Sequence, residues 1–203
     1  MMKTILFATT NKNKIARLKN FIQNDKLNII SLDELGYHIN EPEESGSTPS
    51  QIAANKALYY WSKLKVKIPV LAQDDTIEFL GVKELAGKRL SIKTPVVKEY
   101  GEFNDENAIK FYTSIANKYG GEIKMRFNYG FAICVDGKAK SRKAVLNCKL
   151  VNQVSKIIDP GYFLTSIMRV EIDNKIVFYS ELSLDQQARI DNSLARAVSF
   201  LLK

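Results

Sequence analysis

The sequence predicts an α/β fold with a mixed β-sheet and flanking helices. Strand-like and helix-like hydrophobic periods alternate along the chain. Residues 69–72 form a continuous apolar run, typical of a strand covered on both faces, and two pairs of alternating segments enclose turn residues. With 203 residues, 45% of them hydrophobic, the chain can bury one sizeable core or two lobes that share one sheet. The sequence contains no internal repeat and no low-complexity linker.

The first predicted strand and helix flank a polar turn. Residues 5–8 are apolar and β-prone, and apolar residues recur at helical spacing from 15 to 22. The turn therefore lies at a helix N-terminus, where backbone N–H groups and the helix dipole favour an anion. Further donors for phosphate oxygens come from the side chains of Thr9, Thr10, Asn11, Lys12 and Lys14. A capped helix with lysines on its solvated face is the alternative interpretation.

The next predicted elements are a strand, a helix and a buried strand. Residues 27–32 form the second strand. The helix after it has three start signals, because Thr48 can cap, Pro49 suits the first helical position and Gln51 completes a capping box. The helix runs to about Leu64, and the buried strand Pro69–Ala72 then ends in Gln73-Asp74-Asp75-Thr76.

Turn and cap signals predict the rest of the chain. Residues 81–101 are irregular and lysine-rich, and they predict only a loop or lid with short extended pieces. Asn104 caps a helix over 105–118 that stops at Gly120-Gly121. The last predicted elements are strands 123–135 and 139–151 around Asp136-Gly137, strands 167–172 and 176–179 around Asp173-Asn174-Lys175, and one terminal helix from the Ser183/Gln186 capping box to Leu201.

The second chemical feature is a pair of carboxylates after a buried strand. Ligands bind beyond the carboxyl ends of parallel strands, so Asp74 and Asp75 lie beside the first turn if their strand neighbours the first one in parallel. Carboxylates opposite a phosphate site suit a divalent cation between them, and Mg²⁺ takes one or two carboxylates with phosphate oxygens and waters. The metal would polarise the phosphoryl group and help to generate or orient a water nucleophile. Turn chemistry or a helix cap is the alternative role of such a pair.

Composition and charge narrow the choice of partners. The formal net charge of +8 suits nucleic acid, anionic lipid or phosphorylated small molecules. The lysines are scattered, as on a solvated surface, and a nucleic-acid partner is not expected. No apolar run of about 18 residues predicts a membrane span, and the N-terminus lacks a signal-peptide pattern, which predicts a cytoplasmic protein. Cys134 and Cys148 are expected to be buried thiols.

Three segments, in this order, resemble the inosine triphosphate pyrophosphatase family, whose members act on deaminated purine nucleotides. The first is Thr-x-Asn-x-x-Lys at a strand end, here Thr9–Lys14. The second is Glu-[Ser/Thr]-Gly-x-[Thr/Ser], here Glu44–Thr48, before a helix with Lys56-Ala57. The third is a strand ending in Ala-[Asp/Glu]-Asp-[Ser/Thr], here Ala72–Thr76. The resemblance covers residues 3–80 and is faint beyond them.

The resemblance implies a long twisted mixed sheet with two lobes around a central cleft, a single domain over residues 1–203, and a homodimer. It implies cleavage of a nucleoside triphosphate between the α- and β-phosphates. Asp74 would bind metal or act as the general base, Glu44 would bind Mg²⁺, and Lys56 would neutralise phosphate charge. The triphosphate would be held by Thr9, Thr10, Asn11, Lys12, Asn13 and Lys14, of which Lys14 is also a candidate catalytic residue, and substrate would further contact Asp75, Gly161 and Tyr162.

Departures from the family pattern affect the metal site and the base preference. Gln73 replaces an acidic residue, so one expected carboxylate is missing unless Asp75 takes its place. The Phe-Gly-Tyr-Asp-Pro segment survives only as residues 159–163. A Lys and a Ser-His-Arg near the C-terminus are replaced by Gln187 and Asp191-Asn192-Ser193. The charged part of the base-contacting segment is then absent, unless the register differs and the charge comes from Arg189 or Arg196.

Two hypotheses for the function remain open. The first is a Mg²⁺-dependent nucleotide pyrophosphatase with an altered base preference. The second is a non-catalytic relative that binds nucleotide or uses its basic surface for RNA. Retention of Glu44 and Asp74 favours the enzyme, because a pure binder gains little from carboxylates near a polyanion. His38, the only histidine, is expected to be a solvated surface residue, which argues against a histidine-dependent mechanism.

Overall fold

The computed structural model describes residues 3–22, 27–43, 45–82 and 92–203. The chain separates into two compact units. Unit 1 comprises Met1–Asp75, Tyr129–Ala144 and Asp191–Lys203, and unit 2 comprises Thr76–Asn128 and Val145–Ile190. Three long strands contribute residues to both units, namely β3 (Val70–Phe79), β4 (Glu122–Val135) and β5 (Lys138–Val151).

The strands form one seven-stranded sheet of mixed direction with the order β2-β1-β3-β4-β5-β6-β7. β1 (Lys3–Phe7) pairs in parallel with β2 (Leu27–Ser31) and with β3, in the register Leu6↔Val70 and Phe7↔Leu71. β6 (Met168–Ile172) pairs antiparallel with β5 and with β7 (Lys175–Phe178). The predicted α/β class with a mixed sheet is therefore confirmed, as is the parallel neighbourhood of the first and third strands.

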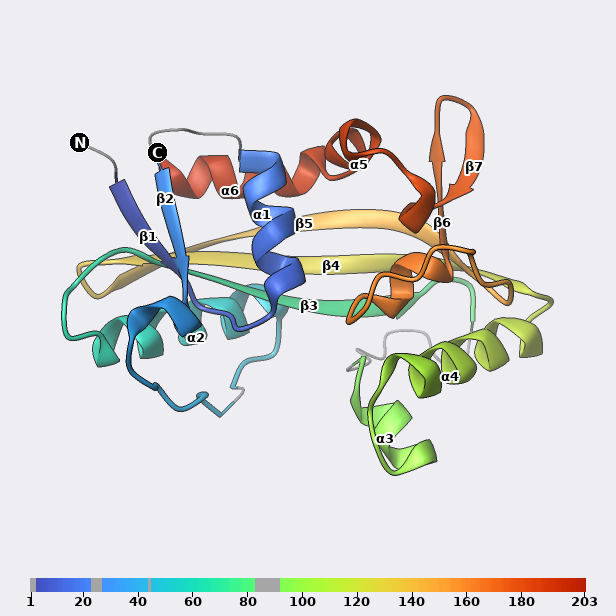
Figure 1. Ribbon diagram of the computed structural model, residues 1–203, viewed down its shortest axis with the longest axis horizontal. Helices are drawn as coiled ribbons and strands as arrows, with labels where there is room; N and C mark the ends of the chain where they lie inside the picture. Colours follow the sequence, from blue (N-terminus) through green and yellow to red (C-terminus); the bar gives the residue numbers. More distant parts are fainter. Residues whose placement is uncertain (1–2, 23–26, 44, 83–91) are drawn as a thin grey trace. The chain divides into compact units, whose positions relative to one another are not determined.

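Helices cover the sheet of unit 1, as Figure 1 shows, with α2 (Pro49–Lys63) on one side and α1 (Lys12–Ile22) packed against α6 (Asn192–Leu202) on the other. Side chains alternate across a strand, so a strand between two helical layers is apolar on both faces. The α2 side of this core contains Leu6, Ala53, Ala57, Tyr60, Leu64, Val70, Ala72, Ala132 and Cys134.

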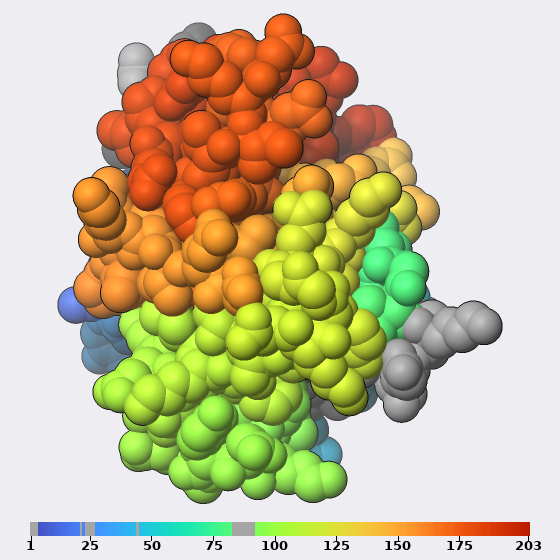
Figure 2. Space-filling view, turned by 90° about the vertical axis from the view of Figure 1, so that its right-hand side faces the viewer, coloured from blue at the N-terminus to red at the C-terminus, as the bar shows by residue number. Residues whose placement is uncertain are grey.

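Unit 2 has an aromatic core between α3 (Thr94–Tyr100), α4 (Asp105–Lys118) and the short 3₁₀ helix Phe163–Ser166. The rings of Tyr112 and Phe163 stack with centroids 5.6 Å apart, and Phe103 meets Phe163 edge-on at 5.9 Å. Figure 2 shows the surface of this unit, with α3 and α4 in green and the segment after β5 in orange. The short helix α5 (Leu184–Ile190) completes the unit.

Local start and turn signals were predicted correctly. Thr48 caps α2 by accepting a hydrogen bond from the Gln51 amide at 3.1 Å, and Asn104 caps α4 by accepting one from the Asn107 amide at 2.8 Å. The Gln51 side chain accepts from the Ser47 amide at 3.0 Å, one residue upstream of the predicted capping-box partner. Asp136 and Gly137 have φ of 49° and 73° between β4 and β5, as a two-residue hairpin turn requires.

The predicted strand Pro69–Ala72 was too short. β3 runs from Val70 to Phe79, so the Asp-Asp pair lies within the strand and not after it. Aspartate is depleted in strands. It is accepted here because Ile77 and Phe79 continue the buried face and because lysines neutralise both carboxylates.

Two helices differ from the prediction. Residues 94–100 form α3, not a loop, while residues 83–91 of the same prediction lie outside the described residues. Pro95 in the first turn and Gly101 at the C-cap, with φ of 80°, are ordinary helix-end signals, and Val96 is buried. The predicted single terminal helix is divided into α5 and α6 at Asp191, whose side chain is buried.

The second hairpin has a tighter turn than predicted. Asp173 and Asn174 alone form the turn, with φ of 52° and 58°. Lys175, the first residue of β7, already pairs with Ile172, the last residue of β6. Within the described residues, no helix combines the length and the apolar character needed to cross a bilayer. Both cysteines are free and buried, as predicted, and burial raises the pKa of each thiol.

Candidate functional site

The turn between β1 and α1 is shaped by its own side chains. The Thr9 hydroxyl accepts a hydrogen bond from the Asn11 amide at 3.1 Å. The Asn11 side-chain oxygen accepts from the amides of Asn13 at 3.0 Å and Lys14 at 3.2 Å, and so caps α1. The turn is therefore held without a ligand. Asn11 already occupies two amides of the first helical turn, so fewer backbone donors are open there than the sequence predicts.

Parallel pairing brings the first turn to β3. The Ala8 amide donates to the Leu71 carbonyl at 2.8 Å, so the residues that follow β1 lie beside those that follow Leu71. The Lys14 ammonium consequently reaches the Asp75 carboxylate at 3.2 Å, across 61 residues of sequence.

Helix α2 supplies the second cation. Ala53 and Ala57 face the core, and Lys56, on the flank of the same helix, donates to the Asp74 carboxylate at 3.1 Å. Asp74 is 8% exposed. Two lysines thus face two aspartates, and each ammonium has a carboxylate partner when no ligand is bound.

A pocket of about 140 Å³ lies at the turn. Four predicted site residues line this pocket, namely Thr9, Thr10, Lys14 and Lys56, together with Gln73, which replaces an acidic residue of the family pattern. The full lining is Ala8, Thr9, Thr10, Lys14, Leu32, Glu41, Pro42, Lys56, Tyr60 and Gln73. Sequence reasoning missed Glu41 and Tyr60. Glu41 belongs to the acidic run before Glu44, which was a usable signal, whereas Tyr60 lies among the core residues of α2 and carries no such signal.

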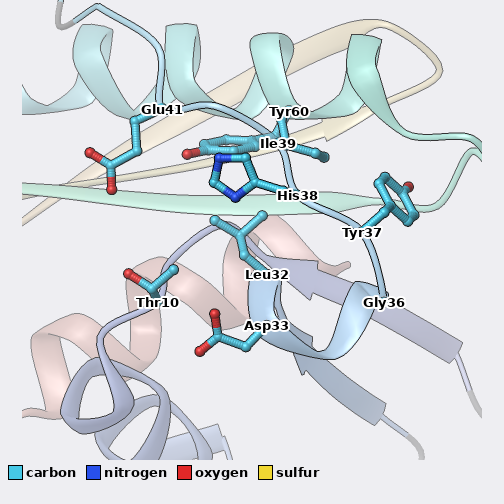
Figure 3. Close-up of a pocket in the computed structure, with 9 residues that line it drawn as sticks. All are labelled: Thr10, Leu32, Asp33, Gly36, Tyr37, His38, Ile39, Glu41 and Tyr60. Carbon is cyan, nitrogen blue, oxygen red and sulfur yellow. The ribbon is translucent and has the colours of Figure 1, made fainter.

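A larger pocket of about 340 Å³ adjoins the first, and Figure 3 shows its lining. Thr10, Leu32, Glu41 and Tyr60 line both pockets. Burial, and secondarily the charge of Glu41, raises the pKa of Tyr60, so its hydroxyl is a neutral donor at neutral pH. His38 lines the larger pocket, is exposed as predicted, and has Nε2 3.1 Å from the Asn40 side-chain oxygen.

The donor set suits a hard divalent cation. Among the described residues, no three His, Cys, Asp or Glu side chains cluster closely enough to hold a metal alone. Mg²⁺ needs no such cage, because it binds through one or two carboxylates plus substrate phosphates and waters. Asp74 and Asp75 fit that requirement, while Glu44 lies outside the described residues.

The remaining predicted site residues lie apart from the pocket lining. Lys12 is exposed at the start of α1. Gly161 and Tyr162 belong to unit 2, where the Gly161 amide donates to the Asp105 carboxylate at 2.6 Å, and their contact with substrate stays a prediction. Arg189 pairs with Asp173 in unit 2, with nitrogen–oxygen distances of 3.1 and 2.5 Å.

The fold and the site define an α/β protein with a polar pocket at its first strand-to-helix turn, whose two lysines are paired with aspartates of β3. The chain belongs to the Ham1 family, whose sequence profile matches residues 5–194. This match confirms the resemblance to the inosine triphosphate pyrophosphatase family.

Individual relatives agree with this assignment. A dITP/XTP pyrophosphatase of Clostridium tetani is 28% identical over 137 residues, which span 66% of this chain and 64% of the relative, so the match covers less than two thirds of that protein. A HAM1 protein from Coxiella burnetii superposes with a TM-score of 0.71 at 18% identity, covering 99% of this chain and 98% of its own. The Staphylococcus aureus Ham1 protein gives 0.67 at 21% identity, with 98% and 96% covered. The two structures share the fold.

Proposed function

We propose that the protein is a Mg²⁺-dependent hydrolase that converts nucleoside triphosphates to nucleoside monophosphate and pyrophosphate. One observation supports this function above the others: two lysine–aspartate pairs, Lys14–Asp75 and Lys56–Asp74, lie at the helix-capping turn that follows the first strand. Lysines bind a polyphosphate as point charges. The carboxylates beside these lysines would repel a polyanionic ligand unless a cation lies between the carboxylates and the ligand.

Each charged residue has a distinct role in the proposed reaction. Mg²⁺ would polarise the phosphoryl group. By the family resemblance Glu44 would hold it, and Asp74 would either hold it as well or act as the general base. In the general-base role, the Asp74 carboxylate accepts a proton from water as the water oxygen bonds to the α-phosphorus. The bond from that phosphorus to the bridging oxygen breaks, and pyrophosphate leaves with the bonding electrons. Lys56 and Lys14 transfer their hydrogen bonds from aspartates to phosphate oxygens, while Thr9 and Thr10 offer hydroxyl donors.

The other sequence predictions are kept as parts of the proposal. Residues 1–203 would act as one domain, a proposal supported by a family match that spans residues of both units. The substrate would be of the ITP, XTP or dITP class, and the protein would work as a cytoplasmic homodimer, with no nucleic-acid partner.

A pyrophosphate-release assay tests the function and its specificity together. ITP, XTP, dITP, ATP and GTP are compared with Mg²⁺ and with EDTA. We expect release with Mg²⁺ only, and discrimination between ITP or XTP and the normal purine nucleotides well below about a thousandfold, because Asp191-Asn192-Ser193 brings no positive charge. A preference of about a thousandfold for ITP or XTP over ATP and GTP, abolished by Arg189→Ala, would contradict the expected weak discrimination. Nucleotide binding without release would support the non-catalytic alternative.

Lys14→Ala is expected to weaken triphosphate binding at least about tenfold and nucleoside binding less than about twofold. The ammonium–phosphate contact has no counterpart in the unphosphorylated ligand, and a charge-assisted hydrogen bond contributes roughly 1.5–3 kcal/mol. Calorimetric titrations with a non-hydrolysable ITP analogue and with inosine measure both affinities. Lys19→Ala, an exposed lysine later in α1, is the control. Equal losses for both ligands would show that Lys14 does not contact phosphate.

A further inference from the structure

Arg17 and Asp191 form a two-point ion pair inside unit 1. Arg17 Nε and Nη2 donate to the two Asp191 carboxylate oxygens, each at 2.6 Å, and the side chains are 16% and 3% exposed. Arg17 Nη1 also donates to the Tyr129 hydroxyl at 3.2 Å, and the guanidinium carbon lies 5.3 Å from the Tyr129 ring centroid. The guanidinium is thus fixed by two hydrogen-bonded partners in a defined orientation.

The pair joins α1, which starts at the candidate site, to the beginning of α6. Arg17 lies on α1, three residues after Lys14, so both side chains project from neighbouring positions of one helix face. Asp191 precedes the first residue of α6, where the chain passes from α5 into a new helix, and α1 packs against α6. A rotation or slide of α1 that moved Lys14 away from Asp75 would therefore also break the contacts of Arg17.

Stability alone is a weak reason for such a pair. Desolvation of two charges offsets much of their attraction, and apolar residues of similar volume often replace a buried ion pair without loss of stability. Loss of one partner is costly, because the other charge is left buried. The directional contacts of Arg17 are the property that an apolar pair would not reproduce.

We propose that the Arg17–Asp191 pair is a positioning element that holds α1, and with it the Thr9–Lys14 turn, in the orientation that binds polyphosphate. This inference rests on the proposed function of that turn. Displacement of a binding group by about 1 Å can cost up to about a hundredfold in kcat/KM, so a small rotation of α1 is expected to have a measurable effect. The effect falls on substrate affinity, because the turn contacts phosphate before and during the reaction.

The test separates positioning from stability with a double variant. Arg17→Met and Asp191→Leu are made singly and together, and inorganic tripolyphosphate with Mg²⁺ is titrated calorimetrically. Each single variant is expected to lower Tm, and the double variant to recover it. We nevertheless expect the double variant to show a tripolyphosphate Kd raised at least about tenfold, KM raised by the same factor and kcat within about threefold of wild type.

Arg17→Lys is the second test, because it keeps the charge and loses the two-point geometry. It is expected to fold and to raise Kd at least about fivefold. The matched control is Arg126→Met, which removes an arginine paired with Glu78 at 3.6 Å in unit 2 and is expected to leave Kd unchanged.

Wild-type Kd in Arg17→Lys, or in a double variant of recovered Tm, would overturn the proposal. If the wild-type protein releases no pyrophosphate from any nucleotide, the proposed reaction fails and the tripolyphosphate Kd still decides the role of the pair. Absence of tripolyphosphate binding by the wild type would overturn both.

Discussion

Asp74→Asn is expected to lower turnover at least about a hundredfold, the usual scale for loss of a positioned base or a metal-bound carboxylate. Asp74 is buried beside the pocket, and its carboxylate accepts a hydrogen bond from the Lys56 ammonium at 3.1 Å. An amide in its place cannot take a proton from water, and it binds Mg²⁺ more weakly than a carboxylate does. The same substitution leaves Lys56 without its anionic partner, so a stability measurement must accompany the kinetics.

The measurement is steady-state pyrophosphate release over a range of Mg²⁺ concentrations, with Tm recorded for each protein. Asp185→Asn, an exposed aspartate on α5, is the control and is expected to keep wild-type turnover. A metal-ligand role predicts that added Mg²⁺ restores part of the turnover, whereas a base role predicts that it does not. Turnover within a few-fold of wild type in a folded Asp74→Asn protein would exclude both roles.

Gly130→Ala is expected to cost about 3 kcal/mol or more of unfolding free energy, at the upper end for an overpacked core. A Cβ at this position of β4 would lie 2.1 Å from the Pro49 carbonyl carbon and 2.2 Å from the Ser50 nitrogen. Both are backbone atoms of the first turn of α2, so no side-chain rotation relieves the clash. The start of α2 would have to move off the sheet and take Lys56 with it.

Urea unfolding of purified protein measures this cost, and pyrophosphate release is expected to fall with it. Gly36→Ala is the matched control. Gly36 has φ of 71° with nothing within 4 Å of an added Cβ, so its substitution costs only the left-handed backbone penalty of roughly 1–2 kcal/mol. An equal or smaller loss at Gly130 would show that the start of α2 does not lie within contact distance of an added Cβ on β4.

The sequence alone determined the features that depend on neighbouring residues. The Thr9–Lys14 turn, the Thr48 cap of α2 and the Asn104 cap of α4 follow from side chains that bond to their own local backbone. The Asp136-Gly137 hairpin follows from two residues that accept a positive φ. The order of the three motif segments determined the family. The apolar residues 5–8 indicated a strand, and the run 69–72 indicated a strand covered on both faces. Their parallel pairing confirmed the placement of Asp74 and Asp75 beside the turn.

Only the tertiary structure decided where charged residues interrupt or continue an element. β3 continues through Asp74 and Asp75 because lysines from two other elements neutralise them, and α5 ends before Asp191 because its carboxylate binds Arg17, 174 positions away. The same holds for Gly130, whose lack of a side chain matters only because α2 lies against it. Such partners are distant in sequence, so neither hydrophobic periodicity nor local propensity can predict these contacts. A buried charge is tolerated only where the fold supplies its counter-charge.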